Sequence, residues 1–307
     1  MNSIEKALQK QSQKASEQKK QEELQEELQK PLEPEQITQQ DSVEKALKKQ
    51  TMLSKGNNIT STIQIDFAML EKKGFVSINS QRQLINEEYR AIKRKLLDNA
   101  FGPLSKSLNN SNIIMVTSSR PGEGKTFTAI NLALSIALEK DKTVLLVDAD
   151  VLRPNVMKTL ELESKQGLME YLLGENKDIS EVMYKTNLDN LRIIPAGQSH
   201  HLSTELLASE KMFHAVKEFA NRYPDRVVIV DTPPLLGINE TAILANLAGQ
   251  ALVVTEESKT RLVDVEQAVK QLNPEMAIGF LVNKSARVDS KDSGQGYGYG
   301  YYYGGAN

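Results

Sequence analysis

The sequence contains no cysteine, only three histidines and no long apolar run. The absence of cysteine excludes disulfides and cysteine metal sites and is typical of a reducing compartment, and the histidines form no metal-ligand pattern. No apolar run approaches the roughly 18–20 residues of a membrane-spanning helix, and the N-terminus is too polar for a secretory signal. We therefore expect a cytoplasmic chain without a transmembrane segment, which contacts a membrane only through a partner or a surface.

An excess of either charge is lacking as well. The 38 Lys and Arg nearly balance the 40 Asp and Glu, for a net charge of -2, so the composition predicts no nucleic-acid partner. A chain of 307 residues can hold one domain of ordinary size with appendages. We divide it into a low-complexity segment (1–62), one domain (63–284) and a tail (285–307).

The N-terminal segment is rich in Gln, Lys and Glu and has too few apolar residues to form a core, so we expect it to be mostly disordered. It contains a repeat: SIEKALQKQ at residues 3–11 returns as SVEKALKKQ at 42–50. Each copy resembles a short amphipathic helix with a capping Ser. Two interpretations stay open, paired docking peptides and incidental helical low complexity.

The domain reads as short apolar runs that alternate with helical segments. Short apolar runs of this kind, separated by helices, predict an α/β fold with a mostly parallel sheet covered by helices on both faces. Its first helix is expected at residues 84–97, LINEEYRAIKRKLL, where apolar residues recur at helical spacing. The predicted strands are 113–116, 144–147, 191–194, 227–230, 251–254 and 278–282.

The segment SSRPGEGKT, residues 118–126, lies between a predicted strand and a predicted helix. A Gly-rich turn at such a junction lets backbone N–H groups converge on an anion, and the helix N-terminus adds partial positive charge. We expect Lys125 to reach the β- and γ-phosphates of a nucleotide and the Thr126 hydroxyl to bind Mg²⁺. Ser119 departs from the usual pattern, which has Gly there, and an ordinary Gly-containing turn is the alternative. The predicted nucleotide-binding residues here are Pro121, Gly122, Glu123, Gly124, Lys125, Thr126 and Phe127.

Carboxylates follow two further strands. Asp148 and Asp150 end the run VLLVDAD, where one can help hold Mg²⁺ while the other accepts a proton, unless Asp150 only caps the next element. Asp231 ends VVIVD, where a metal-binding or water-positioning carboxylate would sit. We therefore predict Lys125, Asp148, Asp150 and Asp231 as catalytic residues and Thr126, Asp148 and Asp231 as metal ligands.

Three other features are less specific. Asn283, after the last strand, can read the edge of adenine or sit in a surface turn. Arg153 can meet a phosphate or a neighbouring carboxylate. The tail holds five of the nine Tyr between Gly residues, either as phosphoryl acceptors or as a stacking low-complexity segment. The candidate acceptors are Tyr297, Tyr299, Tyr301, Tyr302 and Tyr303.

Together, SSRPGEGKT, VLLVDADVLRP, VVIVDTPP and the Tyr cluster resemble the bacterial tyrosine kinases, with their Walker A loop, two-Asp Walker A′ motif and Asp-x-Pro-Pro Walker B motif. The SIEKAL peptide and the first helix are most similar to the exosortase-associated tyrosine autokinases of exopolysaccharide systems. The resemblance covers residues 83–307. It implies a P-loop NTPase fold of the MinD/ParA-like branch and an autokinase that uses ATP and Mg²⁺ to phosphorylate its own Tyr tail, regulating exopolysaccharide synthesis and export.

The same resemblance implies partners. They are a membrane chain-length or polysaccharide co-polymerase activator at the inner face of the cell membrane, a cognate phosphatase, and further copies of the chain in a ring. In the family an E-x-x-R-x-x-R motif mediates ring assembly; here Glu87 and Arg90 match, whereas Lys93 takes the last position. Lys is a weaker bidentate partner than Arg. From spacing alone, these charges are equally consistent with an ordinary i, i+3 pair.

The rival interpretation is a positioning ATPase similar to ParA or MinD, with water as the acceptor. Those proteins have a signature Lys early in the loop, where this chain has Arg120. That difference, the Asp-x-Pro-Pro motif and the Tyr tail favour the kinase. A nucleotide-binding scaffold without turnover would leave the paired Asp unexplained.

Overall fold

The computed structural model describes residues 62–79 and 83–285. The repeated peptides at 3–11 and 42–50 and the Tyr cluster lie outside the described residues, so what the sequence predicts for them stays a prediction. No helix in the described part of the chain is long and apolar enough to cross a membrane.

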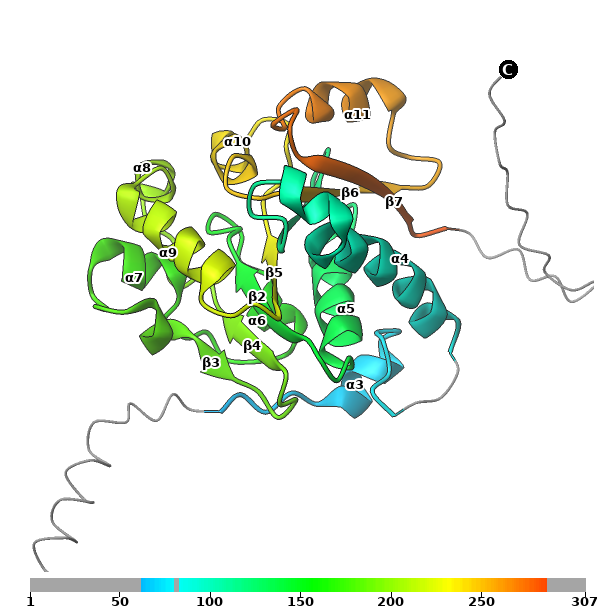
Figure 1. The fold of residues 1–307 in the computed structure, drawn as a ribbon, viewed down its shortest axis with the longest axis horizontal. Helices are drawn as coiled ribbons and strands as arrows, with labels where there is room; N and C mark the ends of the chain where they lie inside the picture. The colour runs from blue at the N-terminus through cyan, green and yellow to red at the C-terminus, as the bar shows by residue number, and fades with distance from the viewer. Residues whose placement is uncertain (1–61, 80–82, 286–307) are drawn as a thin grey trace, which may run out of the picture. The chain divides into compact units, whose positions relative to one another are not determined.

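One sheet of seven strands, in the order β3-β4-β2-β5-β1-β6-β7, organises the described residues (Figure 1). Neighbouring strands run parallel except for β3, which pairs antiparallel with β4. Each of the six predicted runs lies within a strand, and the two-residue β3 is too short to give a pattern. The strands are β1 (Ile113–Ser118), β2 (Thr143–Asp148), β3 (Tyr184–Lys185), β4 (Leu191–Ile194), β5 (Arg226–Asp231), β6 (Gln250–Glu256) and β7 (Ala277–Asn283).

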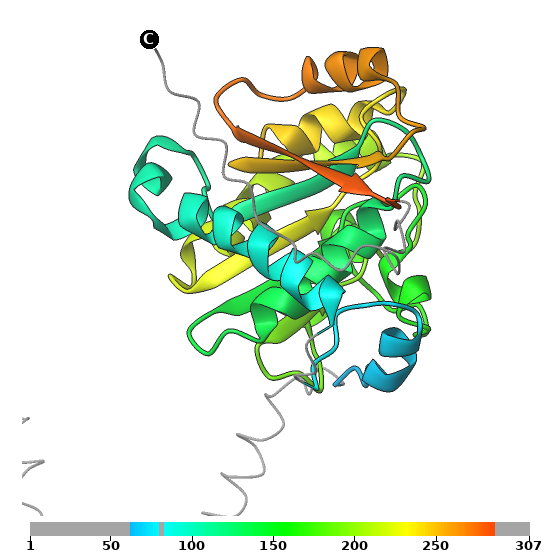
Figure 2. The same ribbon diagram turned by 90° about the vertical axis from the view of Figure 1, so that its right-hand side faces the viewer.

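Helices cover both faces of the sheet, as the apolar runs predicted. Figure 2 shows α4 and α5 on one face, and α4 ends at Phe101 rather than at residue 97. The helices are α3 (Phe67–Lys72), α4 (Leu84–Phe101), η1 (Pro103–Ser107), α5 (Lys125–Ala137), α6 (Val156–Thr159), α7 (Leu168–Leu173), η2 (Ile179–Val182), α8 (Ser203–Leu207), α9 (Glu210–Asn221), α10 (Asn239–Ala245) and α11 (Leu262–Val269).

Strand β1 shows why its sequence has no polar alternation. Ile113 and Met115 pack into a core formed with α7, α9 and α10. Ile114 and Val116 pack into a second core formed with α4 and α5. Because successive side chains of a strand point to opposite faces, a strand buried on both faces needs an apolar residue at every position.

The order of the central strands brings the predicted site together. β5 lies between β2 and β1, and Asp231 is in register with Asp148 on one side and with Val116 on the other. The carboxyl ends of these three parallel strands therefore meet at one edge of the sheet. Ligands of open α/β sheets bind at this edge.

Candidate active site

The phosphate loop, residues 118–126, connects β1 to α5. Gly122 and Gly124 have φ values of 87° and 98°, in the left-handed region that favours glycine. Ser119 is not among the positive-φ residues, so its replacement of the usual Gly places no side chain in the left-handed region. Within the described residues the N–H groups of Glu123 and Gly124 donate no hydrogen bond, and α5 begins directly behind them. Free N–H groups at a helix N-terminus favour an anion.

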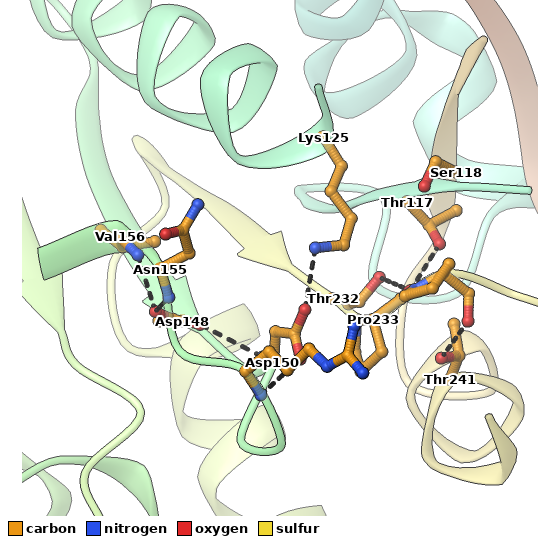
Figure 3. A network of polar contacts seen from close by, with 12 residues as sticks. Thr117, Ser118, Lys125, Asp148, Asp150, Asn155, Val156, Thr232, Pro233 and Thr241 are labelled. Atoms are coloured by element: carbon orange, nitrogen blue, oxygen red, sulfur yellow. Dashed lines mark hydrogen bonds and ion pairs between the residues drawn. The ribbon is translucent and has the colours of Figure 1, made fainter. Parts of the chain in front are cut away.

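Lys125 forms an ion pair with Asp150. Its Nζ lies 2.8 Å from Asp150 Oδ2, and the two side chains are 14% and 5% exposed (Figure 3). The other Asp150 oxygen accepts a hydrogen bond from the backbone N–H of Arg153. The cation expected to contact phosphates thus lies beside a carboxylate that can accept a proton.

Asp148 fixes the turn that presents Asp150. Its carboxylate accepts hydrogen bonds from the N–H groups of Asp150, Asn155 and Val156, at 3.2, 3.1 and 3.0 Å (Figure 3). The sequence left open that Asp150 caps the next element. In the structure Asp150 accepts the N–H of Arg153 in the turn after β2, and the Asp148 carboxylate accepts the N–H groups at the start of α6. Burial raises the pKa of Asp148 to about 6, and the hydrogen bond from Val156 offsets part of this effect.

Asp231 is fully buried, and neither of its carboxylate oxygens has a partner with hydrogen-bond geometry among the described residues, although the nearby Thr126 hydroxyl acts to lower its pKa. Burial, followed by the charge of Asp148, raises the pKa of Asp231 to about 8, while the charge of Lys125 acts in the opposite direction. A buried carboxylate without a partner is costly unless a proton or a cation neutralises it. Asp231 therefore fits a cation-binding role.

The residues present fit Mg²⁺ bound together with a nucleotide. No group of three or more acidic or His side chains in the described ranges can hold a metal by itself. Mg²⁺ does not require one, because it commonly uses one or two carboxylates, water and the phosphate oxygens of a nucleotide. Asp231 and the hydroxyl of the buried Thr126 are the side chains suited to this role.

Threonines hold the loop that follows β5 (Figure 3). Thr117 Oγ1 donates to the carbonyl of Pro233 at 2.9 Å, and Thr241 Oγ1 donates to that of Pro234 at 3.0 Å. The two prolines also stiffen this segment. The wall opposite the phosphate loop is therefore fixed before any ligand binds.

A pocket of about 640 Å³ opens between this wall and the phosphate loop, within the usual range for small-molecule sites. Arg153, a predicted site residue, lies on the wall of this pocket. The polar lining of the pocket includes Lys125, Asp150, Arg153, Asn155 and Lys158, and the apolar lining includes Pro121, Leu152, Pro154, Pro234, Leu236 and Ile238. The predicted Phe127 and Asn283 line a different hollow, beside α4.

The sequence did not predict the residues that support the phosphate loop from behind. The Arg120 guanidinium binds Asp264 of α11 in a bidentate pair, with N–O distances of 2.8 and 3.0 Å. Glu123 accepts hydrogen bonds from the Arg120 backbone N–H and from the Thr260 hydroxyl. The Asn283 side chain donates to the Glu123 carbonyl at 2.9 Å. The sequence predicted that Asn283 contacts adenine and did not predict this contact with the phosphate loop. No motif of the sequence joins these segments.

The proposed subunit contacts on α4 differ among themselves. Glu87 and Arg90 pair at 2.5 Å, and both side chains are about half exposed. Lys93 is buried: its Nζ donates to the Ser135 carbonyl at 2.8 Å and pairs with Glu139 at 2.5 Å. The role of Lys93 as a subunit contact stays a prediction, and its ammonium is already bound within the chain.

Comparison with known proteins places these features in context. The AAA domain family matches residues 111–276. The chain is 32% identical to the tyrosine-protein kinase YwqD of Bacillus subtilis over 199 residues, covering 65% of this chain and 78% of YwqD. It is 34% identical to the tyrosine-protein kinase CpsD of Streptococcus pneumoniae over 175 residues, covering 56% of this chain and 75% of CpsD.

EpsB of Ralstonia solanacearum is 36% identical over 162 residues, which cover 53% of this chain but only 21% of EpsB. The chain thus spans about a fifth of the length of that relative. Among solved structures, the kinase domain of the Escherichia coli tyrosine kinase ETK superposes with a TM-score of 0.57 and 25% identity, covering 81% of this chain and 96% of that domain. The chimerical protein CapA2B2 shares the fold, with a TM-score of 0.61, 21% identity and coverage of 78% and 99%.

Proposed function

Because the chain belongs to the bacterial tyrosine kinase family, we propose that it transfers the γ-phosphoryl group of ATP to tyrosines of its own C-terminal tail. One observation carries the proposal. Lys125 and Asp150 meet at 2.8 Å beside the pocket, at the same sheet edge as Asp231, whose carboxylate has no hydrogen-bond partner among the described residues. Phosphoryl transfer needs a cradled phosphate, a held metal and a positioned acceptor, and these residues provide for each need.

In the proposed reaction the free N–H groups of the phosphate loop and the Lys125 ammonium bind the β- and γ-phosphates. Lys125 must then leave Asp150, whose carboxylate becomes free to accept the proton of a tyrosine hydroxyl. The phenol oxygen forms a bond to the γ-phosphorus as the bond to the ADP oxygen breaks. Lys125 also offsets the negative charge that develops on the phosphate oxygens.

Thr126 and Asp231, with Asp148 beside them, would hold Mg²⁺. When bound, Mg²⁺ neutralises charge on the β- and γ-oxygens. Asp148 already accepts three backbone hydrogen bonds, so we assign it chiefly to positioning Asp150, with any contact to the metal made through water.

The tail tyrosines are the proposed acceptors, and the Gly-rich composition around them favours transfer to a neighbouring copy. The family resemblance further suggests a ring whose contacts include Glu87 and Arg90, a membrane co-polymerase as activator at the inner face of the cell membrane, a cognate phosphatase and a role in exopolysaccharide synthesis. These assignments rest on that resemblance.

The alternative of a ParA- or MinD-like ATPase has less support. Arg120, which takes the position of the signature Lys of those proteins, is committed to Asp264 within the same chain. In that pair the Arg120 guanidinium supports the phosphate loop from the side of α11, and the Asp-x-Pro-Pro motif and the Tyr tail also favour the kinase.

The test is to incubate the purified chain with ATP and Mg²⁺, alone and with the cytoplasmic segment of the candidate membrane activator. Phosphorylated sites are then mapped by mass spectrometry while released phosphate is measured. A kinase gives phosphotyrosine in the tail, and Asp150→Asn abolishes it. Released phosphate without phosphotyrosine would support the ATPase, and neither product would support a scaffold.

A further inference from the structure

We infer that Asn283 and Lys284 form a clamp that holds the phosphate loop in its anion-binding conformation. The inference rests on the proposed function only in taking a nucleoside diphosphate or triphosphate as the ligand. Asn283 is the last residue of β7, the strand at one edge of the sheet (Figure 2). Lys284 follows it directly, and both side chains reach the loop at positions about 160 residues earlier in the chain.

The clamp contacts two successive carbonyl groups. The Lys284 Nζ donates to the carbonyl of Gly122 at 2.7 Å, and the Asn283 Nδ2 donates to that of Glu123 at 2.9 Å. The packing is tight, since a Cβ placed on Gly124 would lie 2.0 Å from the Asn283 Nδ2. Both peptide groups are therefore held from the same side, by a cation and by an amide.

Holding a carbonyl also fixes an N–H group. None of the described peptide bonds is cis, and in a planar trans peptide the carbonyl of one residue and the N–H of the next point in opposite directions. The clamp on the carbonyls of Gly122 and Glu123 thus directs the N–H groups of Glu123 and Gly124 away from β7. These are the donors that lack an acceptor in the described residues and that a phosphate would need.

The backbone at Lys284 indicates that these contacts are favourable enough to offset strain. Its φ is 58°, in the left-handed region that a residue with a Cβ rarely adopts. The ammonium is also held by the Glu256 carboxylate at 3.0 Å. Residues in such conformations persist where the surrounding contacts over-determine them. Lys284 and Asn283 are therefore positioning residues, which act on the nucleotide through the loop.

Lys259 provides a matched control, because it pairs with the same carboxylate. Its Nζ lies 3.0 Å from Glu256 Oε1, its side chain is 73% exposed, and it makes no contact with the phosphate loop. Replacement of Lys259 by Met removes one cation from Glu256 without touching the loop. Replacement of Lys284 by Met removes the same charge together with the clamp.

The experiment measures binding of Mg²⁺-ADP to the full chain by calorimetry. We expect Lys284→Met to weaken binding about tenfold, since it removes a charge-assisted hydrogen bond that preorganises the donors. Lys259→Met should bind within about twofold of wild type, and Lys284→Arg, which can still donate to the Gly122 carbonyl, within about threefold. Wild-type affinity for Lys284→Met, or equal losses for the two Met variants, would overturn the inference.

A further variant, Lys284→Gly, separates positioning from folding. Glycine relieves the left-handed backbone, so the thermal midpoint should stay at or above that of wild type while ADP affinity falls. Parallel loss of both would mean that Lys284 is only structural. Because ADP binding involves no phosphoryl transfer, the outcome is readable even if no tyrosine is phosphorylated, and a failure to phosphorylate would then count against the proposed function alone.

Discussion

Asp231 and Asp264 are two buried carboxylates beside the phosphate loop, and only one of them has partners. Asp264 accepts bidentate contacts from Arg120 and from Arg261, and the hydrogen bond from Arg120 is the main reason that its pKa lies far below the usual range. Asp231 has no partner in the part of the chain that the structure describes, and burial raises its pKa to about 8.

The difference distinguishes a carboxylate that supports the phosphate loop, Asp264, from one that belongs to the candidate active site, Asp231. The side of the loop that faces α11 is complete within the chain, because each charge there meets its opposite. The sheet edge at Asp231 is complete only with a proton or a cation. Buried polar groups without partners are rare in folded proteins, so an unmatched carboxylate marks the place where a ligand is expected.

The largest effect is expected on the incomplete side. Lys125→Met should lower the rate of phosphotyrosine formation by about 10²–10³-fold, because loss of one preorganised electrostatic contact has such an effect in comparable sites. The domain should stay folded, since Lys125 makes a single ion pair within the part of the chain that the structure describes. The measurement is phosphotyrosine formed per minute, with circular dichroism as the control for folding. A variant with near-normal turnover would refute the assignment of Lys125.

Neutralising each carboxylate tests the comparison directly. Asp231→Asn should lower activity strongly while raising the thermal midpoint in the absence of Mg²⁺, because it removes a carboxyl group that must be neutralised to be buried. Asp264→Asn should lower the thermal midpoint and leave more activity, because it leaves two guanidinium groups without their carboxylate. Asp231→Asn should therefore show the larger loss of activity, and Asp264→Asn the larger loss of thermal stability. Equal changes would mean that Asp231 is structural too.

The same carboxylates should respond oppositely to pH. The folded-state pKa of Asp231, about 8, exceeds the ordinary value of 3.8, so the folded protein binds more protons than the unfolded chain between these values. Stability without Mg²⁺ should then fall as the pH rises from about 4 to about 8, and the raised pKa of Asp148 adds to the fall at the lower end of this range. The depressed pKa of Asp264 gives stability that is present above about pH 4 and is lost below it.

Thermal midpoints measured across this range in EDTA, for wild type and Asp231→Asn, test the expectation. The variant should lose most of the slope above pH 6. An unchanged slope would show that another group causes it.

A smaller effect is expected on α4, where one cation is bound within the chain and another is exposed. Lys93→Met should lower the free energy of unfolding by about 1–3 kcal/mol, because it leaves the Ser135 carbonyl without its buried donor. Arg90→Ala should change stability by about 0.5 kcal/mol or less and instead weaken self-association. Denaturant unfolding and light scattering separate the two outcomes. Weaker self-association in Lys93→Met, with unchanged stability, would support the prediction that Lys93 contacts a neighbouring subunit.

The fold could be predicted from the sequence, and the candidate catalytic side chains could be proposed from it, because both signals are local. A strand buried on both faces needs an unbroken apolar run, and a phosphate loop needs Gly, Lys and Thr within a few residues. Parallel strands then bring Asp148, Asp150 and Asp231 to one sheet edge without further information. The six predicted runs and the helix that begins at residue 84 were confirmed for this reason.

Other features were decided only by tertiary structure. The sequence predicted Asp148 as a metal ligand, and only the tertiary structure shows that its carboxylate accepts backbone hydrogen bonds from Asp150 and from the start of α6. The spacing of Lys93 fits a surface as well as an interior position, and packing of α4 against α5 buried it. The clamp joins Lys284 to Gly122 across 162 positions, and no periodicity or motif spans such a separation. Contacts of this kind depend on which segments the sheet order makes neighbours, so they exist only once the chain has folded.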